Sequence, residues 1–213
     1  MKQCELSTID FYNKFIEVFP EFREWTKQDT VEIKKFLRED SIVLDVGCGW
    51  GREIKELAPF CKKIIGIDND PNEIETAKSY LKDIPNVELF VQDAKKTLFP
   101  GEYFDIVISV GNTFGNLGDD KEAVLQEMER LIKKDGKILL SVYSKGANSK
   151  RATAYESIGL KIKTIENGKI IFEDGLVSEE FSKDELKEIF EKFQLKVRFI
   201  DIANIAVLCI VSK

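Results

Sequence analysis

The chain has 213 residues, of which 43% are hydrophobic and 10% aromatic, a composition typical of a globular protein with a substantial core. Its formal net charge is −6 and its pI is about 5.0, which argues against a large basic surface for nucleic acid. Histidine is absent, so a histidine general base, a Ser-His-Asp triad and a histidine-ligated metal are excluded. We therefore expect neither nucleic acid as a partner nor a metal site.

The cysteine spacing and the N-terminal residues indicate the compartment. Cys4, Cys48, Cys61 and Cys209 include no C-x-x-C pair, so zinc and redox motifs are disfavoured and free thiols in a reducing compartment are expected. Residues 1–15 lack the apolar core of a signal peptide, and no apolar run approaches transmembrane length. These features predict a cytoplasmic protein without membrane contact.

The first two thirds of the chain alternate between predicted strands and helices. Apolar residues at helical spacing predict a helix over 9–22, broken or kinked at Pro20, and a second helix from about Asp29 to Arg38. Five strands follow at 41–47, 62–70, 87–93, 104–110 and 137–144. The helices between them are expected at 52–57, from Pro71, and from a cap at Asp119 to a turn at Asp135 and Gly136. The alternation predicts a parallel sheet with helices on both faces.

The pattern changes after residue 144. A short helix is expected over 150–158, and strands 160–165 and 169–174 flank a hairpin turn at Glu166-Asn167-Gly168. Ser182 with Glu185 forms a capping-box pattern that opens a last helix. Strands 195–202 and 205–211 are then expected to close the sheet as an antiparallel hairpin. Residues 145–181 are therefore interpreted as an insertion between the fifth strand and its helix.

A glycine-rich turn lies between the first strand and its helix, in VLDVGCGWG at residues 43–51. Glycines 47 and 49 let the backbone approach a ligand near a helix N-terminus. The nicotinamide fingerprint G-x-G-x-x-G is not met, because Arg52 stands at the third glycine position, and the phosphate-binding G-x-x-x-x-G-K-[ST] pattern is absent. Asp45, just before the glycines, suits a positively charged cofactor such as S-adenosylmethionine better than a pyrophosphate.

Acidic residues also follow the second and third predicted strands. Asp68 and Asn69 end the second strand, where ligands of open α/β sheets bind, and the Asp68 carboxylate is expected to accept hydrogen bonds from ribose hydroxyls. Asp93 ends the third strand and is placed to accept a hydrogen bond from the exocyclic amine of adenine. Each acid alone is equally well explained as a helix cap, as expected for Asp70 before Pro71.

Taken together, these segments resemble the motifs of class I S-adenosylmethionine-dependent methyltransferases. The matching stretches are VLDVGCGWG, GIDND, VQDA, FDIVISVGNTFGNL and LIKKDGKILLSVYS, within about residues 40–144. The resemblance implies a Rossmann-like, seven-stranded sheet, S-adenosylmethionine as cofactor and S-adenosylhomocysteine as product. It assigns cofactor contacts to Gly47, Gly49, Asp68, Asp93 and Ala94, with Val110 as a backbone wall. Asp135 departs from the pattern, since a glycine is usual there.

The resemblance also suggests a division of one methyltransferase domain into four parts. These are an N-terminal helical lid (1–39), a cofactor-binding core (40–144), a small cap insertion (145–181), and a closing helix and hairpin (182–213).

The methyl acceptor is expected at the loop GNTFGN, residues 111–116, after the fourth strand. Asn112 and Thr113 offer amide and hydroxyl groups there. The loop is not the D/N-P-P-Y motif of nucleic-acid amino methyltransferases, and it is similar to the GNSF-type loop of glycine and sarcosine N-methyltransferases. A simple Gly-Asn turn explains it equally well. No catalytic base is assigned, because an amine or thiolate acceptor needs little base.

Further candidates come from the lid and the cap. Tyr12 and Trp25 are expected to close over the methionine end of the cofactor. Arg151 and Tyr155 share a helical face at i and i+4, which suits a substrate carboxylate and hydroxyl, and Tyr143 ends the fifth strand near the same cleft. An ordinary surface helix face explains Arg151 and Tyr155 equally well.

The first hypothesis is therefore a methyltransferase that acts on a small molecule, with an amine, acid, hydroxyl or thiol as acceptor. A protein or RNA acceptor is the alternative that keeps the chemistry. A non-catalytic S-adenosylmethionine-binding module is a third possibility. A nicotinamide oxidoreductase is disfavoured by Arg52 and by the absence of a Tyr-x-x-x-Lys pair. The sequence does not indicate the oligomeric state.

Overall fold

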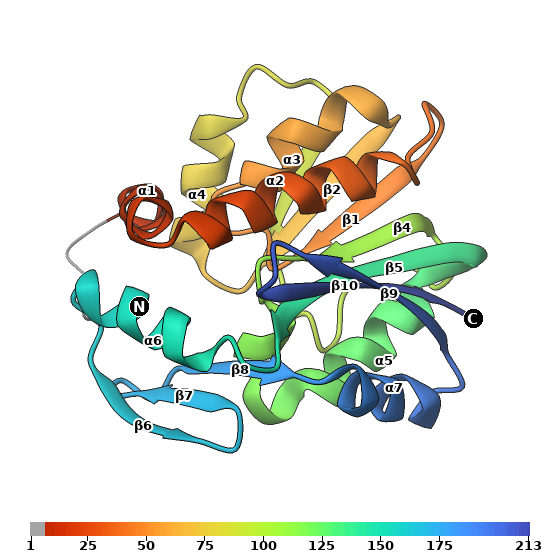
Figure 1. Cartoon of the computed structure of the whole chain (residues 1–213). Helices are drawn as coiled ribbons and strands as arrows, with labels where there is room; N and C mark the ends of the chain where they lie inside the picture. The colour runs from red at the N-terminus through yellow and green to blue at the C-terminus, as the bar shows by residue number, and fades with distance from the viewer. Residues whose placement is uncertain (1–6) are drawn as a thin grey trace.

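The computed structural model describes residues 7–213 and shows a central sheet with helices on both faces (Figure 1). Its main strands are β1 (Ile42–Val46), β2 (Lys63–Asp68), β3 (Val87–Val91), β4 (Phe104–Ser109), β5 (Ile132–Ser144), β9 (Lys196–Ile202) and β10 (Ala206–Ser212). Strands β1 to β5 run parallel in the order β3-β2-β1-β4-β5, and β10 pairs antiparallel with both β5 and β9. These seven strands confirm the predicted α/β fold class with its closing hairpin.

Helices cover both faces because the strand residues alternate between two apolar cores. The helices are α1 (Thr8–Val18), α2 (Pro20–Lys34), α3 (Arg52–Leu57), α4 (Pro71–Tyr80), α5 (Lys121–Leu131), α6 (Asn148–Ser157) and α7 (Lys183–Lys192). Val43 of β1 packs in the core under α2, α3 and α4, and the next residue, Leu44, packs in the core over α5 and α7. Strands buried on both faces read as uninterrupted apolar runs. No helix within residues 7–213 has the length and apolarity that crossing a membrane requires.

The N-terminal helices differ from the prediction in one respect. The break falls at the predicted place, because α1 ends at Val18 and Pro20 is the first residue of α2, where its missing N–H costs nothing. The second helix, however, does not begin at Asp29. Trp25, Asp29 and Ile33 are buried on one face of a continuous α2, so the inward stripe at i, i+4 spacing extends through the expected boundary.

The segment between α5 and β5 also corrects two expectations. Asp119 does not cap α5: it lies in a 3₁₀ turn, Gly118–Asp120, and Asp120 precedes the helix without a side-chain capping bond. The helix ends at Leu131, and Asp135 and Gly136 lie within β5, where the pairing with β4 shifts register. A β-carbon on Gly136 would lie 2.9 Å from the Asp105 carbonyl oxygen, so this glycine serves a β-bulge and not a helix stop.

The cap contains one strand that the sequence did not reveal. The predicted hairpin is present as β6 (Ile162–Glu166) and β7 (Lys169–Phe172), with Asn167 and Gly168 at positive φ. Strand β8 (Val177–Phe181) pairs antiparallel with β7 and parallel with the end of β5. The cap is thereby joined to the main sheet by backbone pairing. The predicted capping box of Ser182 and Glu185 opens α7.

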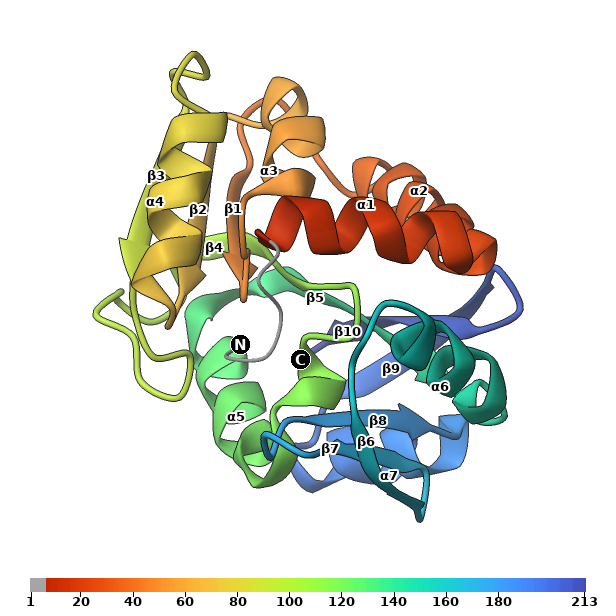
Figure 2. The ribbon, with the colours of Figure 1, turned by 90° about the vertical axis from the view of Figure 1, so that its left-hand side faces the viewer.

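Helices α1 and α6 meet across the carboxyl ends of the parallel strands (Figure 2). Phe15 of α1 stacks on Tyr155 of α6 with ring centroids 5.1 Å apart and an interplanar angle of 11°. The N-terminal helices and the cap therefore enclose the edge of the sheet at which ligands of open α/β folds bind.

Candidate functional site

Two adjoining cavities lie at the carboxyl edge of the sheet. The first, which we call the polar cavity, has a volume of about 410 Å³ and lies beyond β1, β2 and β3. The second, which we call the aromatic chamber, has a volume of about 380 Å³ and lies between α1, the loop after β4, and the cap. Asn116 and Leu176 line both cavities, so the two spaces meet at the loop after β4.

The glycine turn forms one wall of the polar cavity. Gly47 lines the cavity with φ of +73°, and a β-carbon there would collide with Cγ2 of Thr113, which also lines it. The backbone N–H groups of Gly47 and Cys48 donate to the Ile67 carbonyl at 2.9 and 3.0 Å. The turn is therefore fastened to the end of β2, and its close approach to the loop after β4 requires glycine.

Asp68 connects the glycine turn to the next strand end. Its Oδ2 accepts the N–H of Gly49 at 3.0 Å, and its Oδ1 accepts the N–H of Asp70 at 3.0 Å. Each carboxylate oxygen has a second lone pair, so Asp68 retains acceptor capacity toward the cavity that it lines. The polar group predicted to accept ribose hydroxyls thus also holds the glycine turn in place.

Three further predicted residues line the same cavity, whereas Gly49 lines neither cavity. Asn69, Asp93 and Ala94 are among the lining residues. Asp93 accepts the N–H of Lys95 at 2.9 Å, and its carboxylate is exposed. The structure therefore brings the ends of β1, β2 and β3 together as the sequence predicted.

Asp45 is placed differently from the prediction. It is 3% exposed and lines neither cavity, because its side chain points to the same face of β1 as Val43, toward α3. Burial raises the pKa of Asp45 well above its usual range, and nearby Glu53 raises it further. Arg52 pairs with Glu53 at 2.5 Å. Asp45 therefore belongs to a buried charged layer behind the glycine turn and has no direct access to a ligand.

Trp25 and Val110 also lie behind the cavity walls. Trp25 is fully buried, and its Nε1 donates to Ser141 Oγ at 3.2 Å, so the expectation that it closes over the cofactor is wrong. The same Ser141 Oγ accepts the N–H of Gly111 at 3.2 Å and donates to Asp29 Oδ2 at 2.5 Å. Val110 is 9% exposed, and Gly111, the next residue, lines the aromatic chamber in its place. A buried network thus positions the backbone after β4.

Asn112 links three elements at the chamber wall. It is 2% exposed and has φ of +70°. Its Oδ1 accepts the N–H of Tyr143 at 3.1 Å, and its Nδ2 donates to Asn116 Oδ1 at 3.0 Å and to Ser178 Oγ at 3.2 Å. The amide expected to contact an acceptor is therefore committed to holding β4, β5 and β8 together.

Tyr12, expected over the methionine end of the cofactor, lines the aromatic chamber and not the polar cavity. Its ring packs edge-on against Trp50 of the glycine turn, with centroids 5.7 Å apart, and lies 5.3 Å from the guanidinium carbon of Arg52. Helix α1 is further tied to α4 by a hydrogen bond from Thr8 to Glu73. In the sequence, Arg52 is distinctive only as a departure from the nicotinamide fingerprint, and no sequence signal indicates this packing role.

Tyr143 and Tyr155 line the chamber, and Arg151 does not. Tyr155 Oη shares a hydrogen bond with Ser178 Oγ at 3.1 Å. Arg151 is fully buried and donates to Ser178 Oγ at 3.1 Å and to the Gly168 carbonyl at 2.8 Å. Its expected direct contact with a substrate carboxylate is therefore not available. The i, i+4 spacing on α6 identified neighbours correctly, but it could not show that the cap hairpin covers Arg151.

Phenylalanines that the periodicity assigned to a helix core supply much of the chamber wall. Phe11, Phe15 and Phe22 line it from α1 and α2, and Phe172 lines it from β7. These residues form both core and cavity, because α1 rests on the open end of the sheet. Helical spacing alone does not distinguish the two situations.

Comparison with known proteins supports the same interpretation. Residues 43–136 match the family model described as a methyltransferase domain. An uncharacterized methyltransferase, YcgJ, of Bacillus subtilis is 32% identical over 105 residues, covering 48% of this chain and 41% of the relative. The demethylmenaquinone methyltransferase of Staphylococcus saprophyticus is 30% identical over 124 residues, covering 57% and 52%. The chain thus spans about half the length of these curated relatives.

Solved structures share the fold over most of the chain. The PH0226 protein of Pyrococcus horikoshii superposes with a TM-score of 0.71 at 22% identity, covering 88% of this chain and 89% of that one. An S-adenosylmethionine-dependent methyltransferase of Clostridium acetobutylicum gives 0.70 at 14% identity, covering 94% and 98%. The family model covers the glycine turn and the strand ends that line the polar cavity. The matched segment, residues 43–136, is a methyltransferase domain, and the fold of the chain is that of S-adenosylmethionine-dependent methyltransferases.

Proposed function

We propose that this protein is an S-adenosylmethionine-dependent methyltransferase that acts on a small-molecule acceptor. The observation that carries the proposal is the pair of adjoining cavities with different chemistry, one polar and one aromatic. A transfer reaction needs donor and acceptor in adjacent sites, and Asn116 and Leu176 mark where these two cavities meet.

The residues of the polar cavity fit the nucleoside part of the cofactor. Asp68 has lone pairs left for two vicinal ribose hydroxyls after its two backbone hydrogen bonds. Asp93 offers an exposed carboxylate as acceptor for an exocyclic amine, beside Ala94 and Asn69. The glycine turn presents the backbone of Gly47 to the cavity, and Gly49 lies beside it, held by its N–H bond to Asp68. We assign these residues to the cofactor.

The aromatic chamber is assigned to the acceptor. S-adenosylmethionine, when bound, supplies an electrophilic methyl group on a sulfonium sulfur. Tyr12, Trp50 and the cap exclude water and orient the acceptor, which accounts for much of the rate of an in-line displacement. Among the described residues that line the chamber, Asp174 is the only acid, and it is exposed. We therefore assign no general base and expect the acceptor to lose its proton to water.

Calorimetric titration tests the cofactor assignment first. S-adenosylmethionine and S-adenosylhomocysteine should both bind one site per chain, and NADH, as control, should not bind. The bound protein should then form S-adenosylhomocysteine in the presence of a panel of small aromatic and apolar acceptors. Binding of NADH alone, or of none of the three, would refute the proposal, whereas cofactor binding without turnover on any acceptor class would favour a binding module.

A protein or RNA acceptor is the second candidate, since the curated relatives include a ribosomal protein L11 methyltransferase of Thermosipho melanesiensis, 32% identical over 122 residues. The aromatic chamber favours a small molecule, because the contact between α1 and α6 restricts access to it. A macromolecule would have to insert a single residue between these helices. Transfer of labelled methyl to the protein and RNA fractions of a lysate, compared with its small-molecule fraction, separates the two candidates.

Location and domain organisation complete the proposal. We propose a cytoplasmic protein, supported by free, buried thiols at Cys48, Cys61 and Cys209. We also propose that residues 1–39 and 145–181 act as lid and cap on a core formed by 40–144, with 182–213 closing the sheet. Cell fractionation tests the first statement, and protection of the lid and cap from proteolysis by bound cofactor and acceptor tests the second.

A further inference from the structure

The shape of the aromatic chamber indicates a flat ligand. Eight of the residues that line it are aromatic. Two parallel stacks run through this region: Phe15 on Tyr155 with an interplanar angle of 11°, and Phe19 on Tyr143 with an angle of 9°. Flat walls of this kind favour a planar ring, which gains stacking as well as burial.

One polar atom of the chamber lacks a partner. Tyr143 lines the chamber, is 1% exposed, and its hydroxyl makes no hydrogen bond with any described residue. The neighbouring hydroxyl of Tyr155 is already engaged with Ser178 Oγ. Buried hydroxyls are normally satisfied, so the Tyr143 hydroxyl indicates a missing hydrogen-bonding group. Burial raises the pKa of Tyr143 well above its usual value, and the adjoining Tyr155 side chain raises it further, so this phenol keeps its proton.

The charge beside Tyr143 is positive. The guanidinium carbon of Arg151 lies 4.9 Å from the Tyr143 ring centroid, and its hydrogen bonds go to neutral groups, the Asn148 side chain, Ser178 Oγ and a backbone carbonyl. Glu179 and Glu180 act on Arg151 electrostatically, but neither forms an ion pair with it.

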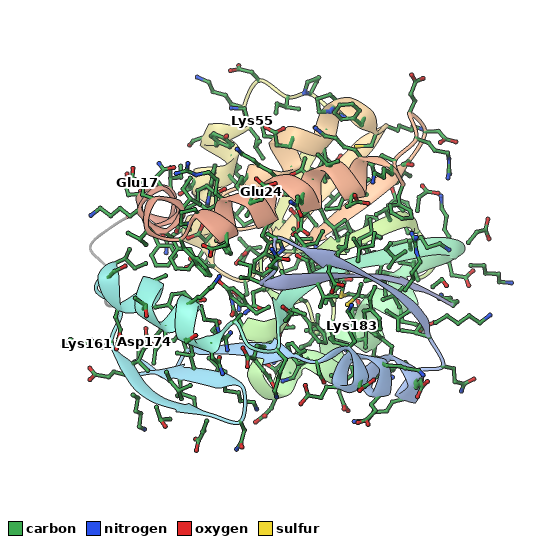
Figure 3. All side chains as sticks on the ribbon, in the orientation of Figure 1. Glu17, Glu24, Lys55, Lys161, Asp174 and Lys183 are labelled. Carbon is green, nitrogen blue, oxygen red and sulfur yellow. The ribbon has the colours of Figure 1, made fainter. Side chains whose placement is uncertain are left out.

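Those two carboxylates are already engaged elsewhere. Glu179 pairs with Lys121 and Lys169, and Glu180 accepts the N–H of Asn148 at 2.9 Å. Asp174, labelled in Figure 3, lies exposed on the turn after β7 and does not neutralise the buried end of the chamber. A buried guanidinium that makes no direct ion pair can still stabilise a negative ligand oxygen, and it disfavours an ammonium group beside it.

We propose that the acceptor is a planar aromatic compound whose hydroxyl or enol oxygen, bound as the anion, accepts a hydrogen bond from the Tyr143 hydroxyl. This inference rests on the proposed function and deepens it by naming the substrate class. It departs from the amine or amino acid suggested by the GNTFGN loop, because the side chains of Asn112 and Thr113 are committed within the protein and the guanidinium of Arg151 has the wrong sign for an amine.

The test uses 4-nitrophenol as a probe, because its phenolate absorbs visible light and its neutral form does not. The protein is first saturated with S-adenosylhomocysteine. The probe should then bind with its apparent pKa lowered by about one unit, which corresponds to an approximately tenfold preference for the anion. Two matched ligands, 4-nitroanisole and benzyltrimethylammonium, should bind at least about tenfold more weakly.

Tyr143→Phe is the decisive variant, because the hydroxyl that it removes makes no hydrogen bond within residues 7–213 and its loss should leave the fold intact. We expect an approximately tenfold loss of 4-nitrophenolate affinity, with the affinities for 4-nitroanisole and S-adenosylhomocysteine unchanged. Tyr103→Phe, in the opposite core of the sheet, is the control and should change none of these values.

The outcomes separate the inference from the function. If S-adenosylhomocysteine does not bind, the proposed function fails and the inference fails with it. If it binds but the probe is bound in its neutral form, or benzyltrimethylammonium competes as well as the phenolate, only the inference is overturned. An unchanged phenolate affinity in the folded Tyr143→Phe variant overturns it as well.

Discussion

Replacement of Asp68 by alanine is the sharpest test of the cofactor placement. The carboxylate accepts two backbone N–H groups, those of Gly49 and Asp70, each at 3.0 Å, and we assign its remaining lone pairs to the two ribose hydroxyls. Hydrogen bonds to a charged acceptor contribute about 1.5–3 kcal/mol each, so the two ribose bonds contribute about 3–6 kcal/mol. At about 1.4 kcal/mol per tenfold change, S-adenosylhomocysteine should bind about 10²–10⁴-fold more weakly.

Calorimetry on the folded variant measures this loss directly. Asp70→Ala is the matched control, because Asp70 lies two residues away and its side chain caps α4 through the N–H of Asn72 at 2.8 Å. That variant should lose about 1 kcal/mol of stability and retain its cofactor affinity. An Asp68→Ala variant that melts cooperatively and binds S-adenosylhomocysteine within about threefold of the wild type would show that the ribose is held elsewhere.

Three further outcomes follow from the geometry. Gly47→Ala should abolish cofactor binding, because its β-carbon would meet the loop after β4. Gly146→Ala is the control, since Gly146 also has positive φ but open space around it. That variant should lose only about 1 kcal/mol of stability in urea unfolding. Hydrogen bonding from Arg130 lowers the pKa of Glu127 from 4.5 to about 2, so the stability lost in Glu127→Gln should be full above about pH 4.5 and vanish as the pH falls toward about 2. Burial raises the pKa of Asp29 well above its usual value, so folding opposes the ionisation of this carboxyl. The stability of the wild type should therefore fall relative to that of Asp29→Asn as the pH rises. A stability difference that stays constant across the pH range would contradict this.

The main sheet was predictable because its signals are local. Strands β1, β2 and β4 are buried on both faces, so mostly apolar runs marked them, and glycines or acids marked where they end. The polar cavity followed from topology, since parallel strands place their carboxyl ends at one edge. The topology alone therefore predicted that Asp68 and Asp93 lie at the same site.

The errors arose where tertiary packing determines the outcome. Asp29 resembles a helix N-cap in sequence, yet it lies in the middle of α2 because Ser141 donates to it across the core. Asp45 precedes the glycines and still faces away from both cavities, since strand alternation turns its side chain toward α3. Strand β8 is short and carries two glutamates, so its sequence lacks a strand signal, and pairing with β5 stabilises it instead.

Asn112 is a residue for which the sequence motif and the structure indicate different roles. The motif suggests an acceptor contact, whereas the structure commits its side chain to Tyr143, Asn116 and Ser178. Two variants separate these roles. Asn112→Ala loses the three hydrogen bonds and also incurs the cost of positive φ, and Asn112→Gly loses the same bonds without that cost.

If the role is to position the chamber wall, both variants should lose about 1–3 kcal/mol of stability in urea unfolding, with the glycine variant the more stable by about 1 kcal/mol. Both should also keep their affinity for S-adenosylhomocysteine, because Asn112 does not line the polar cavity, and should raise KM for the acceptor through a loosened Tyr143. Variants of wild-type stability with a lowered kcat and an unchanged KM would instead assign Asn112 to the reacting atoms. In that case the hydrogen bonds seen in the structure would have to exchange when the acceptor binds, because an amide with both ends engaged has little left to offer a second partner.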